Sequence, residues 1–276
     1  MEVTSVDISS MVWLGVGAAF GIVAPIGIAI WWLVTKKENF VTYVVGMLTF
    51  FVFVFVLEKP IQNALIIPDH AVSRFINARP VLWAFIVGLF PGLFEETGRF
   101  IAFKTLLKKK RNKMTGVTYG LGHAGIEVIL LFGITYATYL SYAFMINTGS
   151  FQTVIDQVAS QAPDQLDAVY QTVDVIANFS LGTLCLNISE RVFAFLFHVG
   201  ASMLVFYAAR ERRKFWLYPV MIAMHTLMDM IAGLYINGTL QVPQAILEVI
   251  VAVIGCITFA GAYVIYKHDY TVFITD

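Results

Sequence analysis

Long apolar blocks separated by short polar segments dominate the pattern of this chain. Most blocks contain about 20 residues or more, the length that an α-helix needs to cross about 30 Å of hydrocarbon at 1.5 Å per residue. The pattern therefore predicts an all-α, polytopic membrane helix bundle with about seven transmembrane helices. The expected spans are roughly residues 11–35, 40–57, 80–107, 115–146, 178–209, 216–236 and 240–266.

The composition agrees with this pattern. Of the 276 residues, 59% are hydrophobic and 13% are charged, whereas about a quarter of the residues of a soluble domain are charged. No polar stretch is long enough to form a soluble catalytic or binding domain, so residues 1–276 are expected to form a single integral-membrane domain. Cys185 and Cys256 lie in apolar blocks and show neither a disulfide framework nor a C-x-x-C spacing.

Basic residues predict the orientation of the chain. Lys and Arg are concentrated in the segments after the first, third and fifth spans, whereas the opposite segment 147–177 holds four aspartates and no Lys or Arg. The positive-inside rule then places the N-terminus outside and the C-terminus in the cytoplasm. The compact loops favour the plasma membrane of a prokaryote.

Ionisable residues inside the apolar blocks are the candidate functional residues. The segment FEETGRF (94–100) interrupts the third span, and the next three spans carry polar groups at GLGHAGIEV, LNISERVFAFLFHV and AMHTLMD. Such groups are costly in hydrocarbon when unpaired, so they mark functional sites by default. The set comprises Glu95, Glu96, Arg99, His123, Glu127, Glu190, His198, His225 and Asp229.

Helical spacing brings these residues to a common level. Glu95 and Arg99 are four residues apart and therefore share a helix face, as do the His123–Glu127 and His225–Asp229 pairs. At 1.5 Å per residue from the cytoplasmic helix ends, Glu95 lies about 18 Å deep, and the three histidines lie about 12, 16 and 14 Å deep. If the four helices pack together, we expect these groups to meet in one polar cavity.

The chemistry of this set favours metal-assisted hydrolysis. Imidazoles and carboxylates from several helices suit a divalent metal, with zinc favoured, and leave a position for water. A spare carboxylate can take the proton of that water as a general base. Arg99 can orient a glutamate or stabilise a developing oxyanion. An amide bond is the expected target.

Other interpretations stay open for the same residues. Glu95 or Glu96 with Arg99 can form a helix-linking ion pair, the His–acid pairs can be polar contacts between helices, and Glu190–Arg191 looks structural. The whole set also suits a metal-ion or proton transporter, although its outer half is poor in ionisable residues. A third possibility is a catalytically inactive membrane scaffold. The Phe-rich second span is expected to face lipid.

The order of EETGR, GLGHAGIE, FLFHV and MHTLMD in consecutive spans resembles the intramembrane CAAX-processing and bacteriocin-processing protease superfamily. Within it, the chain is most similar to the YhfC-like membrane peptidases, and its pattern also resembles the PrsW-type proteases. The resemblance covers a motif-bearing core at about residues 80–236.

The resemblance implies a metal-linked, glutamate-dependent intramembrane protease. Glu95 corresponds to the catalytic glutamate that acts on water, with Glu96 and Arg99 as its motif partners. The histidines of the later motifs correspond to metal ligands, namely His123, His198 and His225; the remaining acids Glu127, Asp229 and Glu190 are possible ligands or orienting groups. The expected partners are a peptide or membrane-protein substrate and the lipid bilayer, and no nucleic acid is expected.

Overall fold

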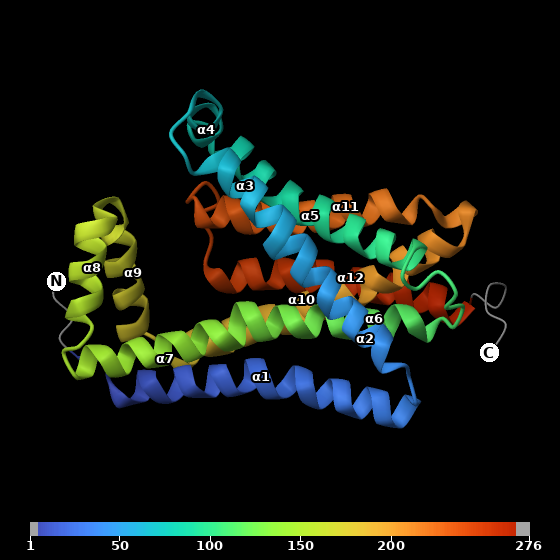
Figure 1. Cartoon of the computed structure of the whole chain (residues 1–276), viewed down its shortest axis with the longest axis horizontal. Coiled ribbons are helices and arrows are strands. Elements are labelled where there is room, and N and C mark those ends of the chain that lie inside the picture. Colours follow the sequence, from blue (N-terminus) through green and yellow to red (C-terminus); the bar gives the residue numbers. More distant parts are fainter. Residues whose placement is uncertain (1–4, 269–276) are drawn as a thin grey trace. The chain divides into compact units, whose positions relative to one another are not determined.

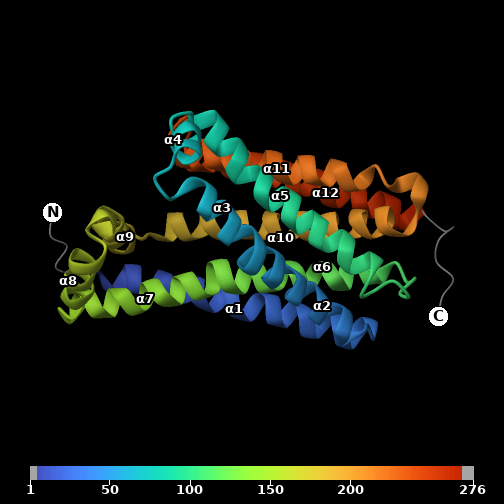
Figure 2. The ribbon, with the colours of Figure 1, turned by 45° about the horizontal axis from the view of Figure 1, so that its top comes forward.

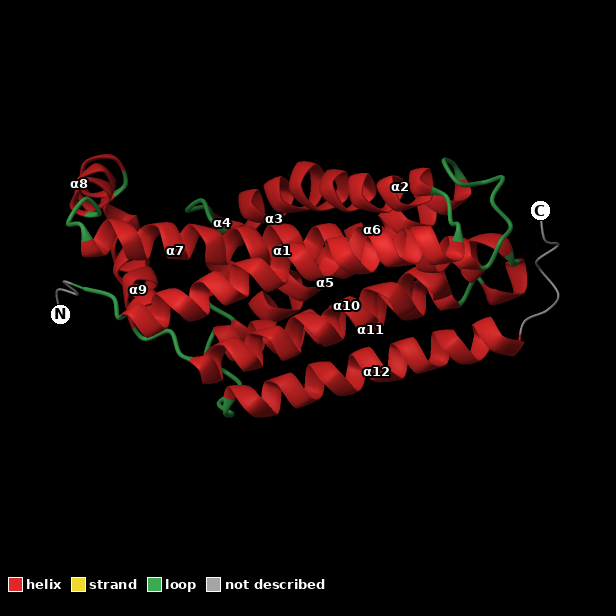
Figure 3. Cartoon of the chain, turned by 90° about the horizontal axis from the view of Figure 1, so that it is seen from below, coloured by secondary structure: helices red, strands yellow, loops and turns green. Residues whose placement is uncertain are grey.

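The structure is a computed structural model that describes residues 5–268. Among these residues every regular element is helical and no strand occurs (Figure 3). Seven helical segments are long and apolar enough to cross a membrane, which confirms the predicted fold class. They are Ile8–Lys36, Phe40–Ile66, Pro80–Lys104, Met114–Asn147, Leu181–Arg210, Arg212–Ile236 and Gln244–His268. The orientation of the termini stays a prediction.

Two of the seven spans contain a π-helix. The second span joins α2, a π-helix and α3, and the fourth joins α6, a π-helix and α7. The elements are α1 (Ile8–Lys36), α2 (Phe40–Phe50), η1 (π, Phe51–Glu58), α3 (Lys59–Ile66), α4 (Ala71–Asn77), α5 (Pro80–Lys104), α6 (Met114–Glu127), η2 (π, Val128–Gly133), α7 (Ile134–Asn147), α8 (Gln152–Gln161), η3 (3₁₀, Pro163–Gln165), α9 (Leu166–Ala177), α10 (Leu181–Arg210), η4 (3₁₀, Arg212–Lys214), α11 (Leu217–Ile236) and α12 (Gln244–His268).

Contacts divide the chain into two compact units. Among the described residues, the first contains 5–26 and 128–191, and the second contains 27–127 and 192–268. Helices α1 and α10 therefore contribute residues to both units. The prediction of a single domain over residues 1–276, which extends past the described residues at both ends, stays a prediction.

The first unit is built around the first part of α1, α7, α9 and the start of α10. A glycine pair lets α1 approach the π-helix η2, because a Cβ on Gly21 would lie 2.6 Å from the backbone of Gly133. Asn187 donates a 2.7 Å hydrogen bond to the hydroxyl of Tyr136, which links α10 to α7. The amphipathic segment 147–177 forms the helices α8 and α9, which lie at the end of α7 (Figure 2).

The second unit pairs α5 with α11 at close range. The two helices lie side by side in both ribbon views (Figures 1 and 2). A Cβ on Gly88 would lie 2.5 Å from the backbone nitrogen of Met230, and one on Gly92 would collide with Thr226. Small residues that allow backbones to approach are typical of membrane helix interfaces. This approach places the acidic turn of α5 against the histidine of α11.

Glycines also hold α6 between two neighbours. A Cβ on Gly46 of α2 would collide with the carbonyl oxygen of Tyr119, and one on Gly122 would collide with the carbonyl oxygen of Tyr43. On the other side, a Cβ on Gly120 would lie 2.9 Å from Val199 of α10. The turn of α6 before His123 is therefore fixed by backbone contacts on both sides.

The second span differs from the sequence-based expectation. It extends to Ile66 rather than ending near residue 57, and only one side of it is exposed. Phe50, Val54 and Glu58 are buried, whereas Phe51 and Phe55 are exposed. The expectation that this span faces lipid was therefore wrong for one of its faces, because hydrophobicity alone does not distinguish lipid contact from helix contact.

A methyl group at the α2–α6 contact should destabilise the second unit. We expect Gly122→Ala to lower the free energy of unfolding by about 1–3 kcal/mol, the usual cost of overpacking, because its Cβ has no room beside Tyr43. Chemical unfolding in detergent measures this change. Gly261→Ala is the control, because no atom lies within 4 Å of a Cβ at that helical position; equal stability losses in both variants would contradict the packing argument.

Candidate metal centre

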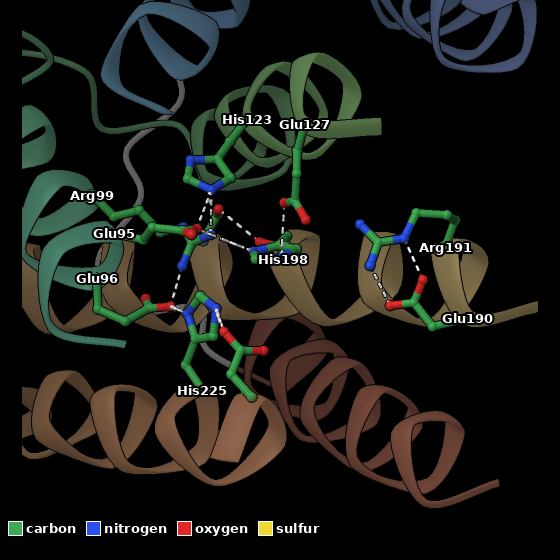
Figure 4. A network of polar contacts seen from close by, with 11 residues as sticks. Glu95, Glu96, Arg99, His123, Glu127, Glu190, Arg191, His198 and His225 are labelled. Carbon is green, nitrogen blue, oxygen red and sulfur yellow. Dashed lines mark hydrogen bonds and ion pairs between the residues drawn. The ribbon is translucent and has the colours of Figure 1, made fainter. Parts of the chain in front are cut away.

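Four helices of the second unit bring the polar groups of the sequence motifs together (Figure 4). Helix α5 supplies three of them, α6 two, α10 one and α11 two. All are buried except Asp229, whose side chain is 32% exposed. In chain order they are Glu95, Glu96, Arg99, His123, Glu127, His198, His225 and Asp229.

Arg99 is fully buried and lies at the centre of this cluster. Its Nη2 donates hydrogen bonds of 2.6 Å to His123 Nε2 and 2.5 Å to His198 Nδ1. The same nitrogen lies 3.4 Å from Glu95 Oε2, and Nη1 donates to Glu96 Oε1. One guanidinium thus contacts acceptors from three helices.

The contacts of Arg99 define how the two imidazoles are oriented. A guanidinium has only donors, so His123 Nε2 and His198 Nδ1 both direct a lone pair at it. Glu95 Oε2 lies 2.9 Å from His123 Nε2 and 3.8 Å from His198 Nδ1. Three electron-pair donors from α5, α6 and α10 therefore meet at one point. A cation between them, here the guanidinium of Arg99, offsets the repulsion between their lone pairs.

His198 is held in place by a carboxylate from another helix. Its Nε2 lies 2.9 Å from Glu127 Oε2, so the ring donates to Glu127 on one side and presents its lone pair on the other. A carboxylate on the outer nitrogen is the usual way in which a metal-binding histidine is oriented. Glu127 thus lies beside His198 of α10 rather than acting only on His123 of its own helix.

His225 bridges two further carboxylates. Its Nδ1 lies 2.9 Å from Glu96 Oε1, and its Nε2 lies 3.5 Å from Asp229 Oδ2. Glu96 is fully buried and also accepts from Arg99. The chain Asp229–His225–Glu96 therefore connects the partly exposed edge of the cluster to Arg99. An imidazole between two carboxylates is suited to carrying a proton from one to the other.

Four residues of the cluster could hold a metal ion. One ligand atom from each of Glu95, His123, Glu127 and His198 lies within 4.8 Å of the others, and all four residues are buried. His225 is outside this group, because its nitrogens face Glu96 and Asp229. The ring of His225 is nevertheless close, with its centroid 5.1 Å from that of His198.

Aromatic rings surround the imidazoles. Phe50 packs edge-on against His123 with a centroid distance of 5.0 Å, and Phe197 packs against His225 at 5.1 Å. These rings replace water with apolar surface, which strengthens the electrostatic interactions inside the cluster. The contacts describe a closely packed cluster, and the polar cavity expected from the sequence stays a prediction.

Comparisons with known proteins identify the family. The family model described as YhfC intramembrane metalloprotease matches residues 20–265. This chain belongs to the YhfC intramembrane metalloprotease family.

A curated relative agrees with the family match. An uncharacterized membrane protein YhfC of Bacillus subtilis (strain 168) is 30% identical over 251 residues, which cover 90% of this chain and 93% of the relative. No solved structure matches. The match and the seven apolar spans together make the chain an integral membrane protein.

One carboxylate near the centre of this YhfC-family protein was missed in the sequence. Glu58 is fully buried at the end of the π-helix η1, where it pairs with Lys59 at 3.2 Å. It also interacts electrostatically with His225 and Asp229. Its place beside Lys59 and Pro60 suggested a loop. The available signal for a buried helical position was the apolar run before Glu58, which continues into an amphipathic turn.

Glu190 lies in the first unit of the YhfC-family chain. Its carboxylate forms an ion pair with the neighbouring Arg191. This contact agrees with the interpretation of Glu190–Arg191 as a structural pair. The group of four possible metal ligands does not include it. A role of Glu190 as a ligand or orienting group stays a prediction.

Loss of Glu96 should destabilise the YhfC-family protein more than loss of a surface acid. Glu96→Ala leaves the buried guanidinium of Arg99 without its partner at Nη1, so we expect unfolding free energy to fall by about 3–5 kcal/mol. Asp69→Ala removes the exposed pair with Arg74 and should cost no more than about 1 kcal/mol. Denaturant unfolding in detergent compares the two variants, and similar losses would argue against a buried, uncompensated charge.

Proposed function

We propose that this protein is an intramembrane metal-dependent endopeptidase of a prokaryotic plasma membrane. Its substrate would be a peptide or a membrane protein whose peptide bond reaches the cluster on α5, α6, α10 and α11. The observation that carries this proposal is the convergence of three buried electron-pair donors, from Glu95, His123 and His198, at one point.

The donor set fits a divalent metal, with zinc as the favoured ion. Two imidazole nitrogens and one carboxylate oxygen are common ligands of catalytic zinc, which keeps a further position for water. Glu95, His123 and His198 would hold the ion, and Glu127 would orient His198. When bound, such an ion polarises a carbonyl group and lowers the pKa of its water toward about 7.

The second half of the cluster suits proton transfer. Glu96 and Asp229 flank His225 on opposite sides. These three residues can therefore accept the proton of the attacking water and pass it to the departing amine. General acid–base groups of this kind contribute about 10²–10⁴ in rate. Arg99 supplies positive charge next to the site, where it can stabilise a developing oxyanion.

This division of roles differs from the one that the family resemblance implies. There, Glu95 acts on water and His225 is a ligand. The contacts favour Glu95 as a ligand, because its Oε2 lies beside His123 and Arg99, and His225 as a proton carrier, because both of its nitrogens face carboxylates. Metal content and cleavage, measured separately, distinguish the two.

An inactive scaffold is the second candidate, and one observation favours it. The guanidinium of Arg99 already contacts the three converging atoms without a metal, through hydrogen bonds to both imidazoles and an ion pair with Glu95. In that case the cluster binds no metal, and substitutions within it change stability only.

Substitution of two histidines tests the proposed function. We expect His198→Ala to lose the bound metal, about one equivalent in the unmodified protein. We expect His225→Ala to retain the metal and to lose cleavage by about 10²-fold or more. Elemental analysis and cleavage of a membrane-peptide library by reconstituted protein provide the two readouts.

His268→Ala is the matched control, because His268 is exposed at the end of α12 and should change neither quantity. Metal loss in His225→Ala would instead support His225 as a metal ligand, the role that the family resemblance implies. Absence of metal from every preparation of the unmodified protein, together with absence of cleavage, would favour the scaffold.

A further inference from the structure

The position of Arg99 Nη2 is the starting point. It is the atom that His123 Nε2, His198 Nδ1 and Glu95 Oε2 have in common. These three atoms are also the donors that would hold a metal. The guanidinium and the metal therefore require the same electron pairs, and each pair can serve only one of them at a time.

The distances show that a guanidinium and a metal ion require different separations from the three ligand atoms. The imidazole nitrogens lie 2.5 and 2.6 Å from Nη2, whereas zinc binds imidazole nitrogen at about 2.0–2.1 Å. Glu95 Oε2 lies 3.4 Å from Nη2, compared with about 2.0–2.2 Å to zinc. The donors must therefore close around a metal after the nitrogen of Arg99 has left.

We propose that Arg99 is a built-in cation that occupies the metal position in the metal-free protein and is displaced when the metal binds. This inference rests on the proposed metal-dependent function. In the metal-free state, Arg99 neutralises Glu95 and satisfies both imidazoles. In the loaded state, the metal does so, and the guanidinium withdraws toward Glu96.

Glu96 provides the place where a displaced guanidinium is retained. It accepts from Nη1, the branch of Arg99 that does not contact the imidazoles. The Nε atom of Arg99 has no hydrogen-bond partner among the described residues, so it does not anchor the side chain in its central position. A rotation about the terminal bonds can therefore move Nη2 away while the ion pair with Glu96 persists.

Displacement would make metal binding a competition between two cations. The measured affinity then equals the intrinsic affinity of the three ligand atoms multiplied by the fraction of molecules in which Arg99 has withdrawn. A monovalent ion gains too little from the three donors to displace a guanidinium of equal charge. Arg99 thus favours divalent ions and keeps the buried donors satisfied during folding, before any metal arrives.

Replacement of Arg99 by methionine tests this competition. Arg99→Met keeps a long side chain but removes the charge, so we expect its affinity for Zn²⁺ to rise about tenfold or more. Chelator competition on purified protein in detergent measures the affinity. The midpoint of thermal unfolding should fall in the metal-free variant and should rise more on addition of Zn²⁺ than in the unmodified protein.

Arg99→Lys and Arg210→Met complete the series. Lysine keeps the charge but loses the forked geometry, so its Zn²⁺ affinity should lie between those of the unmodified protein and Arg99→Met. Arg210 donates to the carbonyl oxygens of Phe103, Leu107 and Lys110 and contacts none of the three donors. Arg210→Met should lower stability equally with and without Zn²⁺ and leave the affinity unchanged.

The outcomes separate this inference from the proposed function. Zn²⁺ binding to the unmodified protein, with equal or weaker binding to Arg99→Met, would overturn the displacement and leave the metalloprotease proposal intact. Failure of Arg99→Met to fold even with Zn²⁺ would do the same, because the metal should replace the missing charge. Absence of Zn²⁺ binding to every variant would overturn both.

Discussion

The buried charge of Arg99 is the constraint on which the rest of the second unit depends. A guanidinium with no exposed surface must find acceptors within the protein, and Arg99 finds them on α5, α6 and α10. The acids of the FEETGRF segment and two of the histidines are therefore held by one central group. Polar side chains that would each be costly in a membrane become compatible with it because they neutralise one another.

Close helix packing makes this mutual neutralisation possible. Gly88 and Gly92 let α5 approach α11, and Gly46 and Gly122 let α2 approach α6, so side chains from different helices reach hydrogen-bonding distance. In lipid, where apolar burial does not drive helices together, such packing and interhelical hydrogen bonds supply the association energy. The glycines before His123 in the motif GLGHAGIEV thus allow the close packing that positions this histidine.

The sequence predicted the seven spans and the members of the cluster because charges and histidines are conspicuous in apolar blocks. It could not predict their partners. The spacing of His123 and Glu127 suggested one shared helix face, yet Glu127 lies against His198 of α10, since partners across helices depend on helix rotation. Glu58 was missed because Lys59 and Pro60 next to it read as a loop, whereas the helix continues to Ile66.

The π-helices have a consequence for how this fold tolerates insertions and deletions. A π-turn holds one residue more than an α-turn, so the segment Phe51–Glu58 aims Glu58 differently from an α-helix of equal length. Removal of a single residue from the π-turn would allow it to close as an α-turn, whereas removal of a residue from α2 before it would turn Glu58 by about 100° about the helix axis. The length of this span is thus tied to the direction of Glu58, and a change of length that hydropathy would tolerate alters the interior unless the π-turn absorbs it.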